Sequence, residues 1–172
     1  MTIVVGAAPI TEDEAAHLIG VNAKAYHFVQ TGDLEGLHRL LEEVREAILA
    51  DPIGGFRSIM DKAPDADREV MADPLWQEGF CIGMREALRP GVDGWFDEAL
   101  VIQGDWVDVD VGAVNASVTW WHSPGDANAP LTAARRLLDR LTASRLILFG
   151  DHEGHLAPYH REGDILDELL AR

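Results

Sequence analysis

The chain has 172 residues, 47% of them hydrophobic, and a formal net charge of −16 at pH 7. This length and composition fit one globular domain, or a small core with a subdomain attached, and no apolar run reaches the roughly 18 residues of a membrane-spanning helix. A surface this acidic repels phosphate backbones and anionic lipids, so we expect neither nucleic acid nor a membrane as a partner.

The cysteine content and the first residues indicate the cellular compartment. The single cysteine, Cys81, excludes an internal disulfide and fits a reducing environment. Residues 1–9 lack the basic residues and the length of a signal peptide, so we interpret them as part of the fold. We therefore expect a cytoplasmic protein whose acidic side chains keep it soluble. Attraction of cationic ligands is the alternative reading of the charge.

The first predicted element is a short β-strand at residues 2–5. Its sequence, Thr-Ile-Val-Val, is apolar and β-branched, which is typical of a buried parallel strand. The Gly-Ala-Ala-Pro run at residues 6–9 ends it. We assign residues 1–10 to the first strand of a core.

Residues 11–106 have a helical pattern and predict four or five helices without a strand. Asp33 can cap a helix that stops at Asp51-Pro52, and Gly54-Gly55 then predicts a turn. Asp73-Pro74 is a second start signal, a cap followed by a first-turn proline, for a helix that ends before Arg89. This segment therefore forms an all-helical insertion between the first strand and the rest of the core.

From residue 107 the pattern changes to alternating strands and helices. Residues 118–121 and 145–149 are predicted strands, a helix opens at Pro130 between them, and a final helix carries an apolar stripe. The stripe comprises Ile165, Leu166, Leu169 and Leu170. This order predicts an α/β fold with three parallel strands and flanking helices, in which the loops at the carboxyl ends of the strands hold the chemistry.

Two of those loops contain a matching pair of polar residues. Asp126 follows the strand that ends at Trp121, and His155 follows the strand that ends at Phe149. A carboxylate on one loop can hold an imidazole on the next loop in one tautomer and stabilise its cation, and Gly154 permits a tight turn that presents the ring. Each residue alone is explained as well by an ordinary turn aspartate or loop histidine, but the two together favour a catalytic pair.

At these residues the chain resembles the C-terminal end of a capped α/β-hydrolase. Asp126 and Pro130 match the family's Gly-x-x-Asp-x-x-x-Pro acid loop, with Ser123 in place of the leading glycine, and Gly154-His155 matches its histidine loop. The resemblance implies that residues 2–5 are the sixth strand, residues 11–106 the cap, and residues 107–172 the C-terminal core. It also implies hydrolysis of an ester, amide, epoxide or related bond in a small apolar substrate, without a metal or organic cofactor.

The nucleophile of such an enzyme is missing from the sequence. The family places it on a Gly-x-Ser-x-Gly elbow before the sixth strand, and under this alignment that elbow would precede Met1. No serine of the sequence lies in such a motif; the serines are Ser58, Ser117, Ser123 and Ser144. We expect the chain to be inactive unless a partner supplies the nucleophile. The alternative is a non-catalytic assembly or small-ligand-binding protein, since the open edge of the first strand predicts a homodimer or a partner chain.

Three other patterns have competing interpretations. Gly79-x-Cys81-x-Gly83 has the form of a thiol elbow, but the apolar spacing around it is helical rather than that of a strand followed by a helix. The cluster Asp151, His152, His155 and His160 has no recognised metal-ligand spacing, so we predict no metal site. The tryptophans could line a substrate pocket or pack in a core; they are Trp76, Trp95, Trp106, Trp120 and Trp121.

Overall fold

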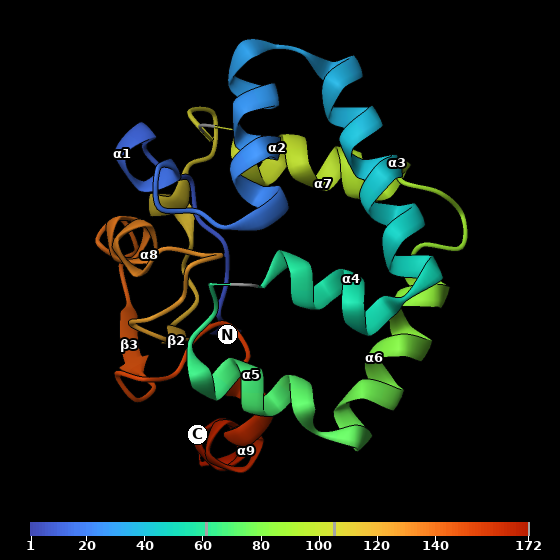
Figure 1. The fold of residues 1–172 in the computed structure, drawn as a ribbon. Coiled ribbons are helices and arrows are strands. Elements are labelled where there is room, and N and C mark those ends of the chain that lie inside the picture. Colours follow the sequence, from blue (N-terminus) through green and yellow to red (C-terminus); the bar gives the residue numbers. More distant parts are fainter. Residues whose placement is uncertain (61, 105, 172) are drawn as a thin grey trace. The chain divides into compact units, whose positions relative to one another are not determined.

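The computed structural model describes residues 1–60, 62–104 and 106–171, and in these ranges helices outnumber strands (Figure 1). The chain divides into two compact units. The strand unit comprises Met1–Ala8, Ala63–Val70 and Val107–Arg172, and the helical unit comprises Pro9–Lys62 and Met71–Trp106. In this division residues 63–70 belong with the strands, and the helical unit begins at Pro9.

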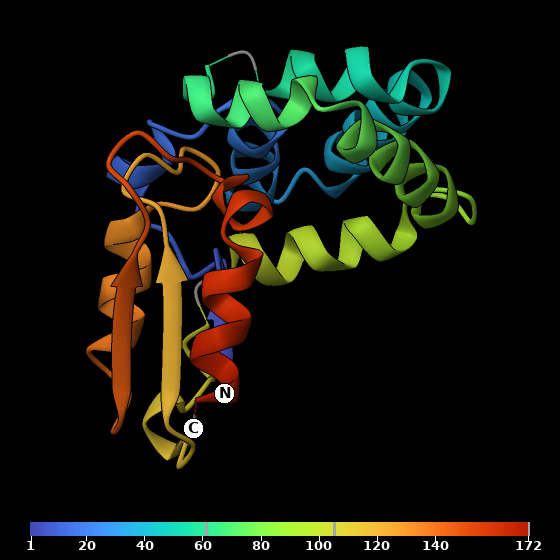
Figure 2. The same ribbon diagram turned by 90° about the horizontal axis from the view of Figure 1, so that it is seen from below.

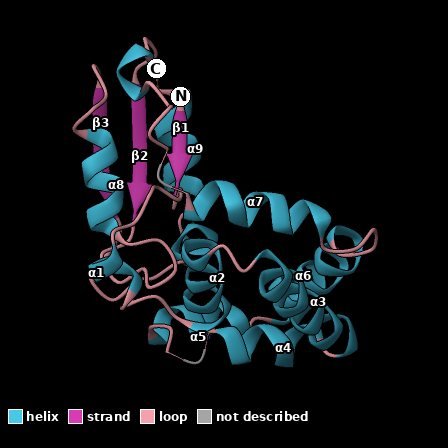
Figure 3. Ribbon diagram, turned by 90° about the horizontal axis from the view of Figure 1, so that it is seen from above, coloured by secondary structure: helices cyan, strands magenta, loops and turns pink. Residues whose placement is uncertain are grey.

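The strand unit contains a three-stranded parallel sheet of order β1-β2-β3, as predicted. The strands are β1 (Thr2–Val4), β2 (Val118–His122) and β3 (Ser144–Leu148), and Figure 3 shows all three running in the same direction. Every residue of β2 is buried, as expected for the central strand of a sheet covered on both faces.

Helices cover both faces of this sheet. Because side chains alternate along a strand, Trp120 packs toward α8 (Leu131–Leu138) and Trp121 toward α9 (Glu162–Leu170), and Figure 2 shows the two helices flanking the sheet. Two short 3-10 helices, Val111–Ala113 and Ala157–His160, complete the C-terminal segment. The predicted α/β arrangement of strands and flanking helices is therefore confirmed.

The helical unit has its own core. Its helices are α1 (Glu12–Ala15), α2 (Gly20–Thr31), α3 (Leu34–Ala50), α4 (Pro52–Ile59), α6 (Pro74–Ala87) and α7 (Asp93–Gln103), and α5 (Asp65–Ala72) begins in the strand unit. Leu37 and Leu41 of α3 are fully buried against α2 and α7. The described part of residues 11–106 thus has more helices than the four or five predicted, since α1, α4 and α5 are short. None of the helices in the described ranges combines the length and apolar character that a bilayer crossing requires.

Aspartate caps define the helix boundaries, and they explain one wrong prediction. The carboxylates of Asp33 and Asp73 accept hydrogen bonds from first-turn backbone N–H groups, as predicted. Asp51 caps α4 in the same way, with Pro52 in its first turn, so Gly54 and Gly55 lie inside a helix and not in a turn. A Cβ on Gly55 would lie 3.1 Å from the backbone of Ile48, so glycine here permits the close approach of α3 and α4.

Candidate active site

The acid loop after β2 holds Asp126 in a fixed position. Its Oδ1 atom accepts hydrogen bonds from the backbone N–H groups of Asn128 (2.8 Å) and Ala129 (2.9 Å), which closes an aspartate turn. Its side chain is fully buried, and Oδ2 remains to face the histidine loop. Oδ1 of Asp126 therefore closes the turn, and Oδ2 of the same carboxylate is the partner of the histidine.

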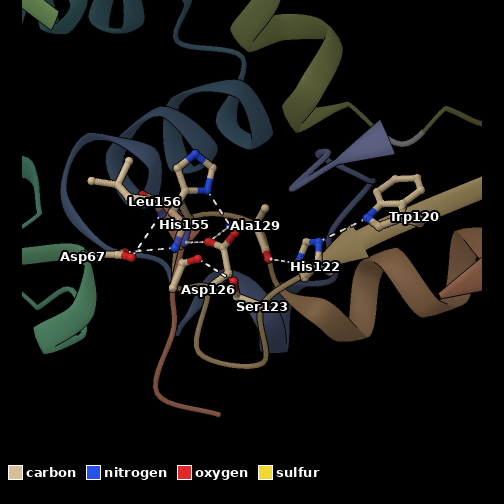
Figure 4. A network of polar contacts seen from close by, with 10 residues as sticks. Asp67, Trp120, His122, Ser123, Asp126, Ala129, His155 and Leu156 are labelled. Atoms are coloured by element: carbon tan, nitrogen blue, oxygen red, sulfur yellow. Dashed lines mark hydrogen bonds and ion pairs between the residues drawn. The ribbon is translucent and has the colours of Figure 1, made fainter. Parts of the chain in front are cut away.

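The histidine loop after β3 brings the imidazole of His155 to that free oxygen. His155 Nδ1 lies 2.9 Å from Asp126 Oδ2, and the side chain remains 34% exposed. Figure 4 shows Nε2 on the far side of the ring, and no described residue hydrogen-bonds it. The carboxylate thus favours the tautomer with hydrogen on Nδ1, which leaves Nε2 able to accept a proton.

The pKa of His155 is raised above the usual value of 6.5. Burial alone would lower this pKa, but the hydrogen bond to Asp126 and the negative charges of Asp126 and Asp67 outweigh it. The site therefore stabilises the imidazolium, which is the species that forms when a histidine acts as a general base.

Two further buried side chains, Ser123 and His122, form hydrogen bonds with the acid and histidine loops. Ser123 is fully buried, and its hydroxyl donates a hydrogen bond to the carbonyl of Gly154, so the residue that replaces the expected glycine ties the two loops together. His122 accepts a hydrogen bond from Trp120 Nε1 (3.1 Å) at Nδ1. Since an indole N–H can only donate, the proton of His122 is on Nε2, which donates to the carbonyl of Ala129 (2.8 Å).

A third polar side chain, Asp67 on α5, completes the site and was missed from the sequence. The residue is 1% exposed, and its carboxylate accepts hydrogen bonds from the backbone N–H groups of His155 (2.9 Å) and Leu156 (3.1 Å). Burial raises the pKa of Asp67, although these two backbone bonds oppose the shift. One signal could have identified it: Val70 and Met71 lie three and four residues later, so Asp67 shares their buried helix face.

Gly154 is required by close contact and not by its backbone conformation. Its carbonyl accepts a hydrogen bond from the N–H of Ala157, so a turn does begin here, but its φ is not among the positive values of the chain, and this turn does not need a left-handed residue. An added Cβ would instead collide with the Asp67 carboxylate and lie 2.9 Å from Pro64 Cγ. The glycine therefore allows α5 to approach the histidine loop.

Comparisons with known proteins concern the fold. No protein-family model and no curated protein matches the sequence. An esterase from Exiguobacterium antarcticum aligns with a TM-score of 0.50 and 14% identity over 76% of this chain and 46% of that structure. The chain has part of an α/β-hydrolase fold.

Two further solved structures align with most of this chain. They are an α/β hydrolase enzyme from a Medee basin deep-sea metagenome library, with a TM-score of 0.47 and 13% identity, and an acetylester hydrolase from Corynebacterium glutamicum, with a TM-score of 0.41 and 14% identity. The alignments cover 99% and 98% of this chain but 54% and 52% of the other structures. The chain therefore spans about half the length of the hydrolase-fold structures that it matches.

The other candidate residues do not form a nucleophile elbow of the hydrolase fold. Cys81 lies in the middle of α6, far along the chain from any strand, and is half-buried and free. Ser117 is exposed, and the hydroxyl of Ser144 donates to the carbonyl of Leu138 at the start of β3. Ser58 lies in α4, and its side chain is outside the described part of the structure.

The remaining alternatives from the sequence are a metal site and a tryptophan-lined pocket. Within the described ranges no three histidine, cysteine or carboxylate side chains are placed to hold a metal ion, and this includes the group Asp151, His152, His155 and His160. Trp120 and Trp121 are buried in the two cores of the strand unit, and Trp95 packs against the core of the helical unit. Trp76 stacks on Phe80, and Trp106 Nε1 donates to the carbonyl of Val101.

Proposed function

We propose that this chain supplies the acid and the histidine of a hydrolytic site, and that a serine or water nucleophile comes from outside it. The observation that supports this most strongly is the 2.9 Å contact between Asp126 Oδ2 and His155 Nδ1, with Nε2 of the same ring left without a described partner. The substrate class that suits the fold is a small apolar ester, amide or epoxide.

The chemistry follows from the tautomer that Asp126 enforces. His155 Nε2 accepts the proton of the nucleophilic hydroxyl as its oxygen attacks the carbonyl carbon, and Asp126 stabilises the resulting imidazolium. His155 then passes the proton to the leaving alcohol, and a water molecule deacylates the intermediate by the same exchange. The donors of the oxyanion hole would have to accompany the nucleophile.

We also propose that the helical unit is a cap that provides apolar surface for the substrate. In support, Phe56, Trp76 and Phe80 form a cluster of half-buried aromatic rings, with centroids 4.6 to 5.9 Å apart. Such rings supply the large apolar contact area that ligand pockets use.

The first test is an ester hydrolysis assay. We expect the purified chain to hydrolyse a nitrophenyl acetate no faster than buffer does, because it carries no nucleophile elbow. Adding a chain that contains Gly-x-Ser-x-Gly, sought in neighbouring reading frames, is expected to produce hydrolysis that His155→Ala removes. Hydrolysis by the purified chain that is lost in His155→Ala would contradict the external nucleophile, and loss in Cys81→Ala would assign the thiol that role.

A second candidate function, that of a non-catalytic assembly or small-ligand-binding protein, has its own supporting observation. On α9, Leu166, Leu169 and Leu170 are all exposed, and β1 is an edge strand of the sheet. Exposed leucines beside an edge strand are typical of an interaction surface. The partner would be a second copy of this chain or the chain that brings the nucleophile.

The self-association form of this candidate predicts a concentration-dependent dimer. The double variant Leu166→Glu and Leu169→Glu is expected to raise the dimer dissociation constant at least about tenfold in sedimentation equilibrium, since it buries charge in an apolar contact. Leu75→Glu on α6, a similarly exposed leucine of the helical unit, is the matched control and should leave association unchanged. A wild-type chain that stays monomeric at millimolar concentration would exclude self-association through this surface. The chain that brings the nucleophile would then be its only remaining candidate partner.

A further inference from the structure

Asp67 is buried, and its carboxylate accepts hydrogen bonds from the histidine loop. Both of its oxygens are used: Oδ2 accepts from the N–H of His155 and Oδ1 from the N–H of Leu156. Figure 4 shows the carboxylate on one side of the loop and Asp126 on the other. A backbone held at two consecutive N–H groups can neither slide nor rotate freely, so the start of the His155 side chain is fixed in space.

In the described part of the chain, no ion pair with a lysine or arginine balances the charge of Asp67. Arg68, the adjacent residue, is bonded to the carbonyl of Ala63 and to Asp65, and no described lysine or arginine forms an ion pair with Asp67. The positive group that acts on Asp67 is His155 itself, while Asp126 repels it. A buried carboxylate without a cation is unfavourable, and a proton on His155 reduces this cost.

We propose that Asp67 is a positioning residue for His155, and that it holds the histidine loop against Asp126 and adds a second negative charge beside the imidazolium. The catalytic benefit of this role rests on the proposed function, since a general base benefits from both effects. The coupling between Asp67 and His155 involves only residues of this chain. It can therefore be measured without a nucleophile or a substrate.

The main experiment compares Asp67→Asn with Asp65→Asn, an exposed aspartate on the same helix. Imidazole NMR titration of the full chain is expected to show a lowered His155 pKa in Asp67→Asn, because a nearby negative charge is removed, and an unchanged one in Asp65→Asn. Amide hydrogen exchange at His155 and Leu156 should become about ten to a hundredfold faster in Asp67→Asn, because bonds to a charged acceptor are lost. Faster exchange with an unchanged His155 pKa would reduce Asp67 to a structural role and overturn the proposal.

A second measurement uses the unaltered protein, in case Asp67→Asn does not fold. The carboxyl carbon resonance of Asp67 should shift at the pH at which His155 titrates, since the two groups sense each other's charge. A flat Asp67 signal through that titration would overturn the proposal. These outcomes are independent of the ester assay: inactivity with an added elbow chain would count against the hydrolytic function, and uncoupled titrations would count against Asp67.

Discussion

Replacing Asp126 with asparagine is expected to move the proton of neutral His155 from Nδ1 to Nε2. The asparagine Oδ1 can still accept from Asn128 and Ala129, so the turn survives. Its NH2 group then faces His155 Nδ1, and because an NH2 group only donates there, Nδ1 must become the acceptor. The ring would stay in place with its Nε2 no longer able to accept a proton.

Imidazole ¹⁵N chemical shifts distinguish the two tautomers directly. In a reconstituted hydrolytic complex, the same variant is expected to lower kcat by about 10⁴-fold, the loss that a wrong histidine tautomer causes in serine hydrolases. Asp151→Asn, an exposed aspartate in the histidine loop, is the control and should change neither the shifts nor the rate. An Nδ1–H tautomer that persists in Asp126→Asn would show that Asp126 does not select it.

The raised pKa of His155 also makes stability depend on pH. The pKa of His155 is higher in the folded than in the unfolded chain, where it is about 6.5, so protonation of His155 stabilises the fold. This stabilisation is complete below the unfolded pKa and is lost as the pH rises through the folded pKa. Urea denaturation from pH 5 to 9 is therefore expected to show a decrease in unfolding free energy that is smaller in Asp126→Asn. An equal decrease in both proteins would assign it to other groups.

Most of the strands and longer helices were predictable because their signals are local and agree with each other. The apolar run at residues 118–121, the proline before α8 and the cap at Asp33 each act within a few residues, and the structure follows all of them. The predicted turn at Gly54-Gly55 was wrong because the cap Asp51 and the first-turn Pro52, three and two residues before Gly54, outweighed the glycines. Short helices such as α1 and α5 carry too few residues for a periodic pattern.

The candidate site also contains residues that the sequence predicts and one that it does not. Asp126 and His155 could be found because each follows a strand, and parallel strands bring such loops to one edge of the sheet. Asp67 could not be found by this logic, since its partners lie 88 and 89 residues away in the sequence. In the sequence it resembles Asp65, an exposed aspartate of the same helical turn, and the only local difference is the apolar pair Val70 and Met71 three and four residues after Asp67.

The contact between Asp67 and the histidine loop leads to the second large expected effect, in the variant Gly154→Ala. One added methyl group would collide with the Asp67 carboxylate and with the ring of Pro64, which lies 2.9 Å from the Cβ position. Neither neighbour can give way easily, because Asp67 is fixed by two backbone bonds and a proline ring is rigid. Overpacking of this kind lowers the free energy of unfolding by about 1–3 kcal/mol.

Gly163→Ala in α9 is the matched control, since a Cβ there meets nothing within 4 Å. In a helix this change is expected to raise the unfolding free energy by up to about 1 kcal/mol, so the two glycine variants of one unit should shift urea midpoints in opposite directions. Gly154→Ala should also shift the His155 imidazole resonances, because α5 and the histidine loop can relieve the collision only by moving apart. A Gly154→Ala protein as stable as the wild type, with unshifted His155 signals, would mean that α5 does not press on this loop, and the positioning role of Asp67 would lose its structural basis.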